Sequence, residues 1–211
     1  MISLTTEQDR EQLREHALSL IDNKDIQGLS IILEVLKDTD FIIPEYTKEN
    51  FYHEVFLKAY FLRKAAELNN LTLIKYLVAQ GANVHTNDEY AFRSAAEKGN
   101  LESVQYFIEL GVDINAGNGY ALNQASEKGH LAVVKYLVEQ GADIHTLSDI
   151  PLRKACSNGQ LEVAKYLIEQ GADIHAMDDY ALFIAKHNGH TDVVTYLEEV
   201  LNFVIPMHRR R

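Results

Sequence analysis

The sequence predicts an all-α solenoid, a stack of similar helix-turn-helix units with short finger loops between them and helical caps at its ends. One stretch, LAVVKYLVEQGADIH at Leu131 to His145, recurs thirty residues earlier as LESVQYFIELGVDIN and thirty residues later as LEVAKYLIEQGADIH. Three series keep the same offset of 30: tyrosines from Tyr76 to Tyr196, glycines from Gly81 to Gly171, and alanines from Ala65 to Ala185. A period of this length is typical of units that bury their apolar faces against their neighbours.

Each unit is predicted to contain two helices. In YALNQASEKGH, Leu122 and Ala125 lie three residues apart on one side of a short helix, which Gly129 ends by adopting positive φ. In LAVVKYLVEQGAD, apolar residues at spacings of three and four predict a second helix that ends before Gly141. Asn69 replaces the first of these glycines in the first unit, and asparagine is the next best tolerated residue at positive φ.

The run GHLAVVKYLVEQGADIH resembles the second half of an ankyrin repeat, and the resemblance covers about residues 57 to 202. An ankyrin repeat usually has about 33 residues, so the residues missing here are expected in the loop that follows GAD. The first helices depart from the family's Thr-Pro-Leu-His opening, because they begin YAFR, YALN, IPLR and YALF. Short repeats of this Tyr-Ala-Leu type resemble those of ankyrin proteins from giant DNA viruses of amoebae (mimivirus-like). The resemblance implies an ankyrin-repeat solenoid.

Four segments are expected along the chain. Residues 1–40 are predicted to form a helical N-terminal cap. Residues 41–56 are an aromatic-rich insertion, and the aromatic side chains of residues 41–61 either wedge the cap against the first repeat or form a docking patch. Residues 57–206 are predicted to form five ankyrin-like repeats, the last of them a C-terminal cap whose helix stops before Pro206. Residues 207–211 are predicted to be a basic tail.

Composition and charge argue against several classes of function. The formal net charge of −11 disfavours binding to nucleic acid. The N-terminus lacks the pattern of a signal peptide and no apolar run reaches the length of a membrane span, so we expect no membrane partner and a cytoplasmic location. The single cysteine, Cys156, occupies the position of Ala96 and Ser126 in neighbouring units and is predicted to be a small buried hydrophobe. We expect a monomer.

No constellation of residues predicts catalysis, a cofactor site or a metal site. The GNG sequence at residues 117–119 does not complete a phosphate-binding motif. Histidines share one slot in three of the four units, and adjacent slots are expected to lie about 10 Å apart, whereas zinc requires ligands within about 2.1 Å. Asn115 holds that slot in the remaining unit, so His85, His145 and His175 are expected to tie one finger to the next by hydrogen bonds. His187 and His190, which flank a glycine, are a weak metal signal.

Two series of tyrosines have alternative interpretations. The series from Tyr76 to Tyr196 lies inside the second helices and predicts a ladder of half-buried rings. Tyr90, Tyr120 and Tyr180 open the first helices, with Ile150 in the equivalent place, and either pack between units or form a contact stripe for a partner.

The residues that differ between units predict the function. Finger residues and first-helix positions such as Arg93, Asn123, Arg153 and Phe183 change in character, while the framework repeats. The ankyrin resemblance implies that these positions line the concave side, as a protein-binding module requires. The predicted partner-binding residues are Tyr90, Arg93, Tyr120, Asn123, Gln124, Leu147, Arg153, Met177 and Tyr180.

We therefore expect a protein-protein interaction module, a binding adaptor or decoy of viral origin that acts on a host protein in the host cytoplasm. A substrate-recognition adaptor for a ubiquitin ligase is an alternative, although the chain shows no F-box-like Leu-Pro opening. An enzyme or a nucleic-acid binder is the disfavoured alternative from another class.

Overall fold

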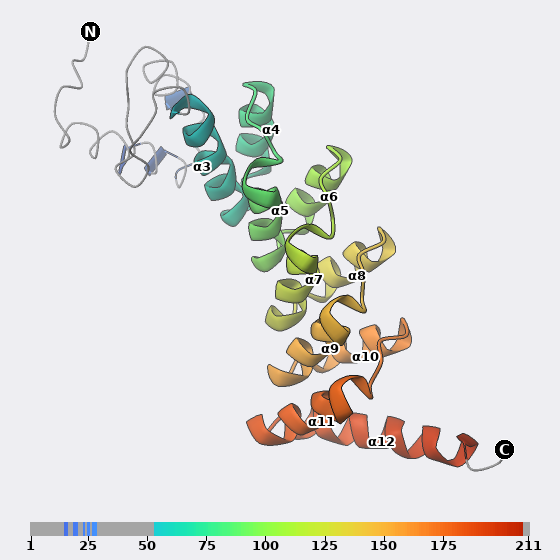
Figure 1. Cartoon of the computed structure of the whole chain (residues 1–211). Coiled ribbons are helices and arrows are strands. Elements are labelled where there is room, and N and C mark those ends of the chain that lie inside the picture. Colours follow the sequence, from blue (N-terminus) through green and yellow to red (C-terminus); the bar gives the residue numbers. More distant parts are fainter. Residues whose placement is uncertain are drawn as a thin grey trace, which may run out of the picture. The chain divides into compact units, whose positions relative to one another are not determined.

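Ten α-helices, paired as five helix-turn-helix repeats, and no β-strand occur in residues 53–208, the continuous part of the chain that the computed structural model describes (Figure 1). Side chains are described for residues 58–202 and for a few positions between residues 15 and 28. The predicted cap, nearly all of the predicted insertion and the end of the predicted tail lie outside the described residues. In chain order the helices are α3 (His53–Glu67), α4 (Leu71–Ala79), α5 (Thr86–Glu97), α6 (Leu101–Glu109), α7 (Ala116–Lys128), α8 (Leu131–Glu139), α9 (Thr146–Ser157), α10 (Leu161–Glu169), α11 (Ala176–Asn188) and α12 (Thr191–His208).

The chain divides into two compact units, residues 1–95 and residues 96–211. In the first unit, α3 packs against α4. In the second unit, the first helices α7, α9 and α11 pack side by side in one layer, and the second helices α6, α8, α10 and α12 form another (Figure 1). Each first helix of the second unit also packs against the second helix that follows it. The predicted all-α architecture of stacked helix-turn-helix units is confirmed.

The residues that repeat every 30 positions form the core. The alanine series of the first helices and an apolar series of the second helices have no exposed surface at all. Alanine keeps the first helices close together, and burial of each large apolar side chain contributes about 1.5–3 kcal/mol. The residues that recur every 30 positions in the sequence are therefore the ones that pack in the core. The two series are Ala65, Ala95, Ala125, Ala155, Ala185 and Leu77, Phe107, Leu137, Leu167, Leu197.

Positive φ at the ends of the helices follows the prediction. Gly129 ends α7 in the left-handed region with φ of 78°, and Gly141 follows α8 with φ of 93°. Asn69, which replaces a glycine in the first repeat, adopts φ of 52°. Asn70 then begins α4, because its side-chain oxygen accepts a hydrogen bond from the Leu73 backbone N–H at 3.1 Å.

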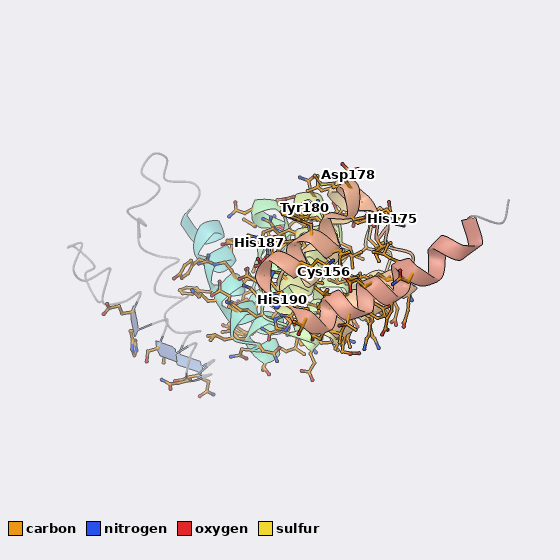
Figure 2. The ribbon with its side chains drawn as sticks, turned by 90° about the horizontal axis from the view of Figure 1, so that it is seen from below. Cys156, His175, Asp178, Tyr180, His187 and His190 are labelled. Atoms are coloured by element: carbon orange, nitrogen blue, oxygen red, sulfur yellow. The ribbon has the colours of Figure 1, made fainter. Side chains whose placement is uncertain are left out.

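The predictions for Cys156 and for Pro206, both in the second unit, had different outcomes. Cys156 on α9 is fully buried, as expected, and burial raises the pKa of its thiol to about 12 (Figure 2). The predicted end of the last helix before Pro206 is wrong, because α12 continues to His208. Only two helical residues follow Pro206, so its missing N–H and the crowding by its ring affect the last turn alone.

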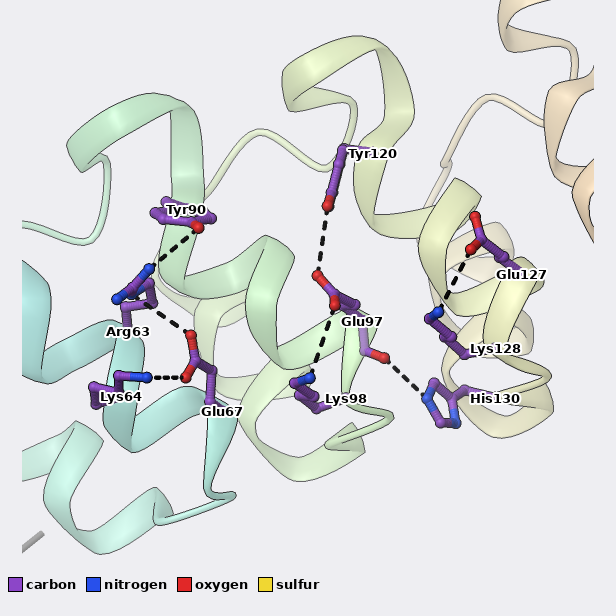
Figure 3. Close-up of polar contacts among 10 residues, drawn as sticks. All are labelled: Arg63, Lys64, Glu67, Tyr90, Glu97, Lys98, Tyr120, Glu127, Lys128 and His130. Atoms are coloured by element: carbon purple, nitrogen blue, oxygen red, sulfur yellow. Dashed lines mark hydrogen bonds and ion pairs between the residues drawn. The ribbon is translucent and has the colours of Figure 1, made fainter. Parts of the chain in front are cut away.

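A glycine of one repeat meets a side chain of the next at each junction inside the second unit. A Cβ atom at Gly99 would lie 2.6 Å from Nδ1 of His130, and one at Gly159 would lie 2.6 Å from Nδ1 of His190. Nε2 of His130 lies 3.0 Å from the Glu97 carbonyl (Figure 3). Nε2 of His190 lies 2.9 Å from the Ser157 carbonyl. Each glycine thus provides both positive φ and the space for an inter-repeat hydrogen bond.

Candidate protein-binding surface

Each finger is built on a left-handed turn of three residues. Residues 117–119, 147–149 and 177–179 of the second unit, and residues 87–89 of the first unit, all have φ between 47° and 71°. The right-handed helix starts at the next residue, so the tyrosines at 90, 120 and 180 open the first helices as predicted. Three consecutive left-handed residues are unusual, because each residue with a Cβ costs roughly 1–2 kcal/mol in that conformation. Other interactions must therefore hold the turns.

Polar side chains of the first helices supply some of these interactions. Arg153 donates from Nε to the Ser148 carbonyl at 2.9 Å and from Nη2 to the Leu147 carbonyl at 2.6 Å. In the first unit, Arg93 donates to the carbonyl of Asn87 at 2.9 Å. These two predicted partner-binding arginines therefore also stabilise their own fingers, and an alanine at either position would loosen the turn.

Asn123 departs from the predicted surface. Its side chain is only 6% exposed and donates to the Asn118 carbonyl at 3.0 Å. The turn folds back over the first helix and covers a position that the helical pattern alone places outside. We therefore assign Asn123 to the support of its finger and leave it out of the proposed surface.

The histidines of the fingers bond within their own finger rather than to the next one. His145 Nδ1 lies 3.0 Å from the carboxylate of Asp149, and His175 Nδ1 lies 2.7 Å from that of Asp179. In the first unit, His85 makes the same contact with the residue four positions later, Glu89, at 2.9 Å. The prediction that these histidines tie successive fingers together is wrong in this respect.

Other side chains make the ties between fingers. The side-chain oxygen of Asn115 accepts a hydrogen bond from the Asp143 N–H at 3.0 Å, as the prediction for this slot requires. In the next finger, Asp149 accepts from the Asp173 N–H at 2.9 Å and is itself buried. In the sequence, each of these histidines is followed four residues later by the carboxylate that pairs with it. After Asn115 the same position holds Gly119.

Most of the predicted surface residues are accessible. Leu147 and Met177 are 56% and 58% exposed, and Tyr90 and Tyr180 are 39% and 37% exposed. Tyr120, Gln124, Arg93 and Arg153 are partly exposed. Phe183, which varies between units but was not among the predicted residues, is 60% exposed. We call the set in the second unit the finger surface: Tyr120, Gln124, Leu147, Arg153, Met177, Tyr180 and Phe183. Tyr90 and Arg93 hold the equivalent positions in the first unit.

The tyrosines that open the first helices contact the preceding repeat and still reach solvent. In the first unit, Arg63 donates to the Tyr90 hydroxyl at 3.2 Å and lies 5.1 Å from the ring centroid (Figure 3). In the second unit, the Tyr120 hydroxyl donates to the carboxylate of Glu97 at 3.4 Å, and Arg153 lies 5.7 Å from the Tyr180 ring centroid. Packing between repeats and exposure to a partner are therefore compatible for these rings.

The second helices present a more uniform face. Their tyrosines are half-buried, which confirms the predicted ladder. Burial raises the pKa of Tyr166 and Tyr196, and the carboxylates of Glu139 and Glu169 in the preceding repeats add to the effect. Lys135 lies 5.5 Å from the Tyr166 ring centroid. These contacts of the second-helix tyrosines are explained by packing between neighbouring repeats.

The described residues give no sign of a metal site or of a membrane span. No three His, Cys, Asp or Glu side chains in the described part of the chain are arranged to hold one metal ion. His190, the weak metal candidate, instead makes the inter-repeat contact with Ser157. Among the helices described here, none combines the length and apolar character needed to cross a bilayer.

Comparison with known protein families agrees with the arrangement of paired helices. A model described as "Ankyrin repeats (3 copies)" matches residues 62–148, and one described as "Ankyrin repeats (many copies)" matches residues 152–198. The chain is an ankyrin-repeat protein. Ankyrin-repeat proteins typically act as non-enzymatic modules for protein-protein interaction. A search of curated proteins gives no match.

Proposed function

We propose that this ankyrin-repeat protein binds another protein through its finger surface. The observation that carries the proposal is a contrast between two sets of exposed side chains. On the finger surface, equivalent positions change in character, as from Gly117 to Leu147 to Met177, whereas the second helices repeat charged residues such as Lys135 and Glu139. A constant framework that presents varied side chains is what selective recognition of a partner requires.

The composition of the finger surface also favours protein recognition. Tyrosine, methionine and arginine are enriched in protein-protein interfaces, and truncation of a few such residues often removes most of the binding energy. On the second helices, exposed side chains such as Glu109, Lys135 and Glu169 are of the kinds depleted in interfaces. The finger surface is therefore the better docking candidate of the two.

The finer proposal is that the chain acts as a monomeric adaptor or decoy, of viral origin, on a host protein in the host cytoplasm. Its support is the resemblance of the short Tyr-Ala-Leu repeats to those of giant DNA viruses of amoebae. A substrate-recognition adaptor for a ubiquitin ligase is the second candidate, and recovery of a cullin scaffold with the protein would favour it.

The test is affinity purification from a cell lysate followed by mass spectrometry with three matched baits. The first is the wild-type chain, the second carries Tyr120→Ala and Gln124→Ala, and the third carries Lys135→Gln and Glu139→Gln. Thermal melting establishes that all three are folded. A partner that binds through the finger surface is retained by the third bait and reduced on the second. A partner lost from the third bait and retained by the second would contradict the proposal.

A further inference from the structure

Large apolar side chains are exposed together near the end of the second unit. They are Leu147, Met177, Tyr180 and Phe183, which we call the apolar patch, and all except Tyr180 are more than half exposed. Scattered exposed apolar residues are normal on a protein surface, but a group of them indicates a site of interaction. The positions that these residues occupy strengthen this interpretation.

Leu147 and Met177 stand where the backbone disfavours them. Each is the first residue of a left-handed turn, with φ of 47° and 54°. The same position holds Asn87 in the first unit and Gly117 in the second, and Asn and Gly are the residue types that adopt this conformation most readily. Leucine and methionine therefore add backbone strain and expose apolar surface at this position. Such strained residues cluster at ligand-binding sites.

Phe183 occupies the position at which Arg153 and Asn123 donate hydrogen bonds to their own turns. A phenylalanine cannot donate, so the last finger loses this support. Its ring instead lies 5.8 Å from the Tyr180 ring and 6.1 Å from the stacked imidazole of His187. Residues 180, 183 and 187 are spaced three and four apart, and so lie on one face of α11.

The two parts of the patch are joined by one side chain. Arg153 on α9 donates to the Leu147 carbonyl at 2.6 Å, and its guanidinium lies 5.7 Å from the Tyr180 ring centroid. The side chain that fixes the turn of Leu147 therefore also contacts the aromatic row on α11. This contact places the turn of Leu147 near the aromatic row of α11.

The charges around the patch favour a basic partner. Two of the nearby cations are offset by carboxylates, since Lys154 pairs with Glu127 and Lys186 lies 2.7 Å from Glu198. Arg153 keeps its positive charge, because the acceptors of its hydrogen bonds are neutral carbonyls of its own turn. Next to Met177, however, Asp178 is exposed and half of the Asp179 side chain is accessible, with one of its carboxylate oxygens 2.7 Å from Nδ1 of His175. Two carboxylates therefore lie near the single guanidinium of Arg153. The formal net charge of the whole chain, −11, has the same sign.

We propose that the apolar patch is the centre of partner recognition and binds the apolar face of a short basic amphipathic helix. This inference rests on the proposed function and specifies where on the finger surface the binding energy is concentrated. A helix whose apolar residues recur at i, i+3 and i+7 matches the aromatic row of α11, and its lysine or arginine residues reach Asp178 and Asp179.

The test measures the binding of three fluorescent synthetic peptides to the full chain by anisotropy. One is an amphipathic helix of leucine and lysine, the second has glutamate in place of lysine, and the third has the leucine-lysine composition in an order without an apolar face. The leucine-lysine helix should bind at least about tenfold more tightly than either of the others. Equal binding of the third peptide would mean that net charge alone attracts it, which overturns the inference.

A variant with Leu147→Asn, Met177→Asn and Phe183→Asn tests the patch itself. Asparagine occurs at the equivalent positions 87 and 123, so the melting temperature should stay the same or rise while affinity for the leucine-lysine helix falls about tenfold or more. The variant Lys135→Gln with Glu139→Gln is the control and should bind as the wild type does. A lower melting temperature together with weaker binding would assign the patch to the fold and overturn the inference.

The remaining outcomes separate the inference from the proposed function. Binding that survives in the asparagine variant and is lost in Tyr120→Ala with Gln124→Ala overturns the inference and leaves the finger surface as the docking site. Binding lost only in the Lys135 and Glu139 variant contradicts both. Absence of binding by every peptide overturns the inference, and the lysate experiment still tests the function. Light scattering that shows dimers of the wild type, abolished by Phe183→Asn, would make a second copy the occupant and overturn the inference.

Discussion

Substitution of Gly159 by alanine tests whether successive repeats are locked together by the glycine and histidine contact. Gly159 has φ of 68°, and a Cβ atom there would lie 2.6 Å from Nδ1 of His190 and 3.0 Å from its Cε1 atom. Alanine would therefore displace the imidazole and break its contact with the Ser157 carbonyl. Gly189 is the matched control, because its φ is 78° and no atom lies within 4 Å of a Cβ built there.

The expected magnitudes follow from this difference. Gly189→Ala should lower the free energy of unfolding by roughly 1–2 kcal/mol, the cost of a Cβ in the left-handed region. Gly159→Ala should cost about the same plus roughly 0.5–1.5 kcal/mol for the lost hydrogen bond. The Ser157 carbonyl still accepts from the Asn188 amide at 2.7 Å, so it does not become unsatisfied. The excess should therefore stay close to about 1 kcal/mol.

A double-mutant cycle with His190→Ala isolates the contact. Without the imidazole, Gly159→Ala has nothing to displace, so its cost should fall to that of Gly189→Ala. The coupling energy should then be about 1 kcal/mol, larger than the roughly 0.3–0.5 kcal/mol expected between independent sites. Urea unfolding followed by far-ultraviolet circular dichroism measures each value, with unchanged m-values as the condition for comparison.

Equal costs at Gly159 and Gly189 would refute the reasoning, and so would additivity in the cycle. Gly129→Ala provides a graded check on the same mechanism. The neighbour there is Gln160, whose flexible amide donates to the Glu127 carbonyl at a longer 3.3 Å and can rotate away from an added methyl group. Its excess cost should lie between those of the other two glycines.

Four other predictions concern the fold and its ends. Gly141→Val should lower the free energy of unfolding by about 1 kcal/mol or more through backbone strain alone, since φ is 93° and the site is open; denaturation detects this, and a change within error contradicts it. Asp149→Ala should cost about 1–3 kcal/mol, because a backbone N–H of the next finger loses its acceptor, whereas Asp179→Ala should be nearly neutral; equal costs would argue against the tie. The Cys156 thiol should react slowly with a thiol reagent in the folded chain. Its pKa is raised from 9.0 to about 12, so stability should decline from about pH 9 toward pH 12 and decline less in Cys156→Ala, and identical profiles would refute this. Deletion of residues 1–40 should cause aggregation or loss of cooperative melting if they cap the first repeat, and a soluble, equally stable truncation would contradict a capping role.

The helices and their ends could be predicted because their signals are strong and local. Apolar residues at spacings of three and four identify the buried face of each helix, and a 30-residue period identifies which residues stack. A glycine after a helix specifies positive φ, and even Asn69 was identified because few other residues tolerate that conformation. The end of α12 was missed because a single proline in the last turn removes too little hydrogen bonding to stop a helix.

The finger turns could not be predicted in the same way. Leu-Ser-Asp and Met-Asp-Asp have no local preference for three left-handed residues. The bonds from Arg153 support the first of these turns, and the contact of His175 with Asp179 is present in the second. Contacts that depend on the conformation of the turn could not be predicted either. Asn123 was expected on the surface because a helical pattern cannot include a turn that folds over the helix. The pairing of His145 with Asp149 was missed although the carboxylate recurs at the same spacing.

The hydrogen bonds between repeats of the second unit run in one direction. The later repeat donates and the earlier one accepts, both where His190 contacts the Ser157 carbonyl and where the Asp173 N–H contacts Asp149. The last finger therefore keeps an acceptor for which no further finger supplies a donor, and Asp179 is half exposed where the equivalent Asp149 is buried. The imidazole of His175, 2.7 Å away, and water can satisfy the oxygens of Asp179 without a donor from another finger. The same exposure leaves acidic groups beside the apolar patch, where they are available to a basic partner.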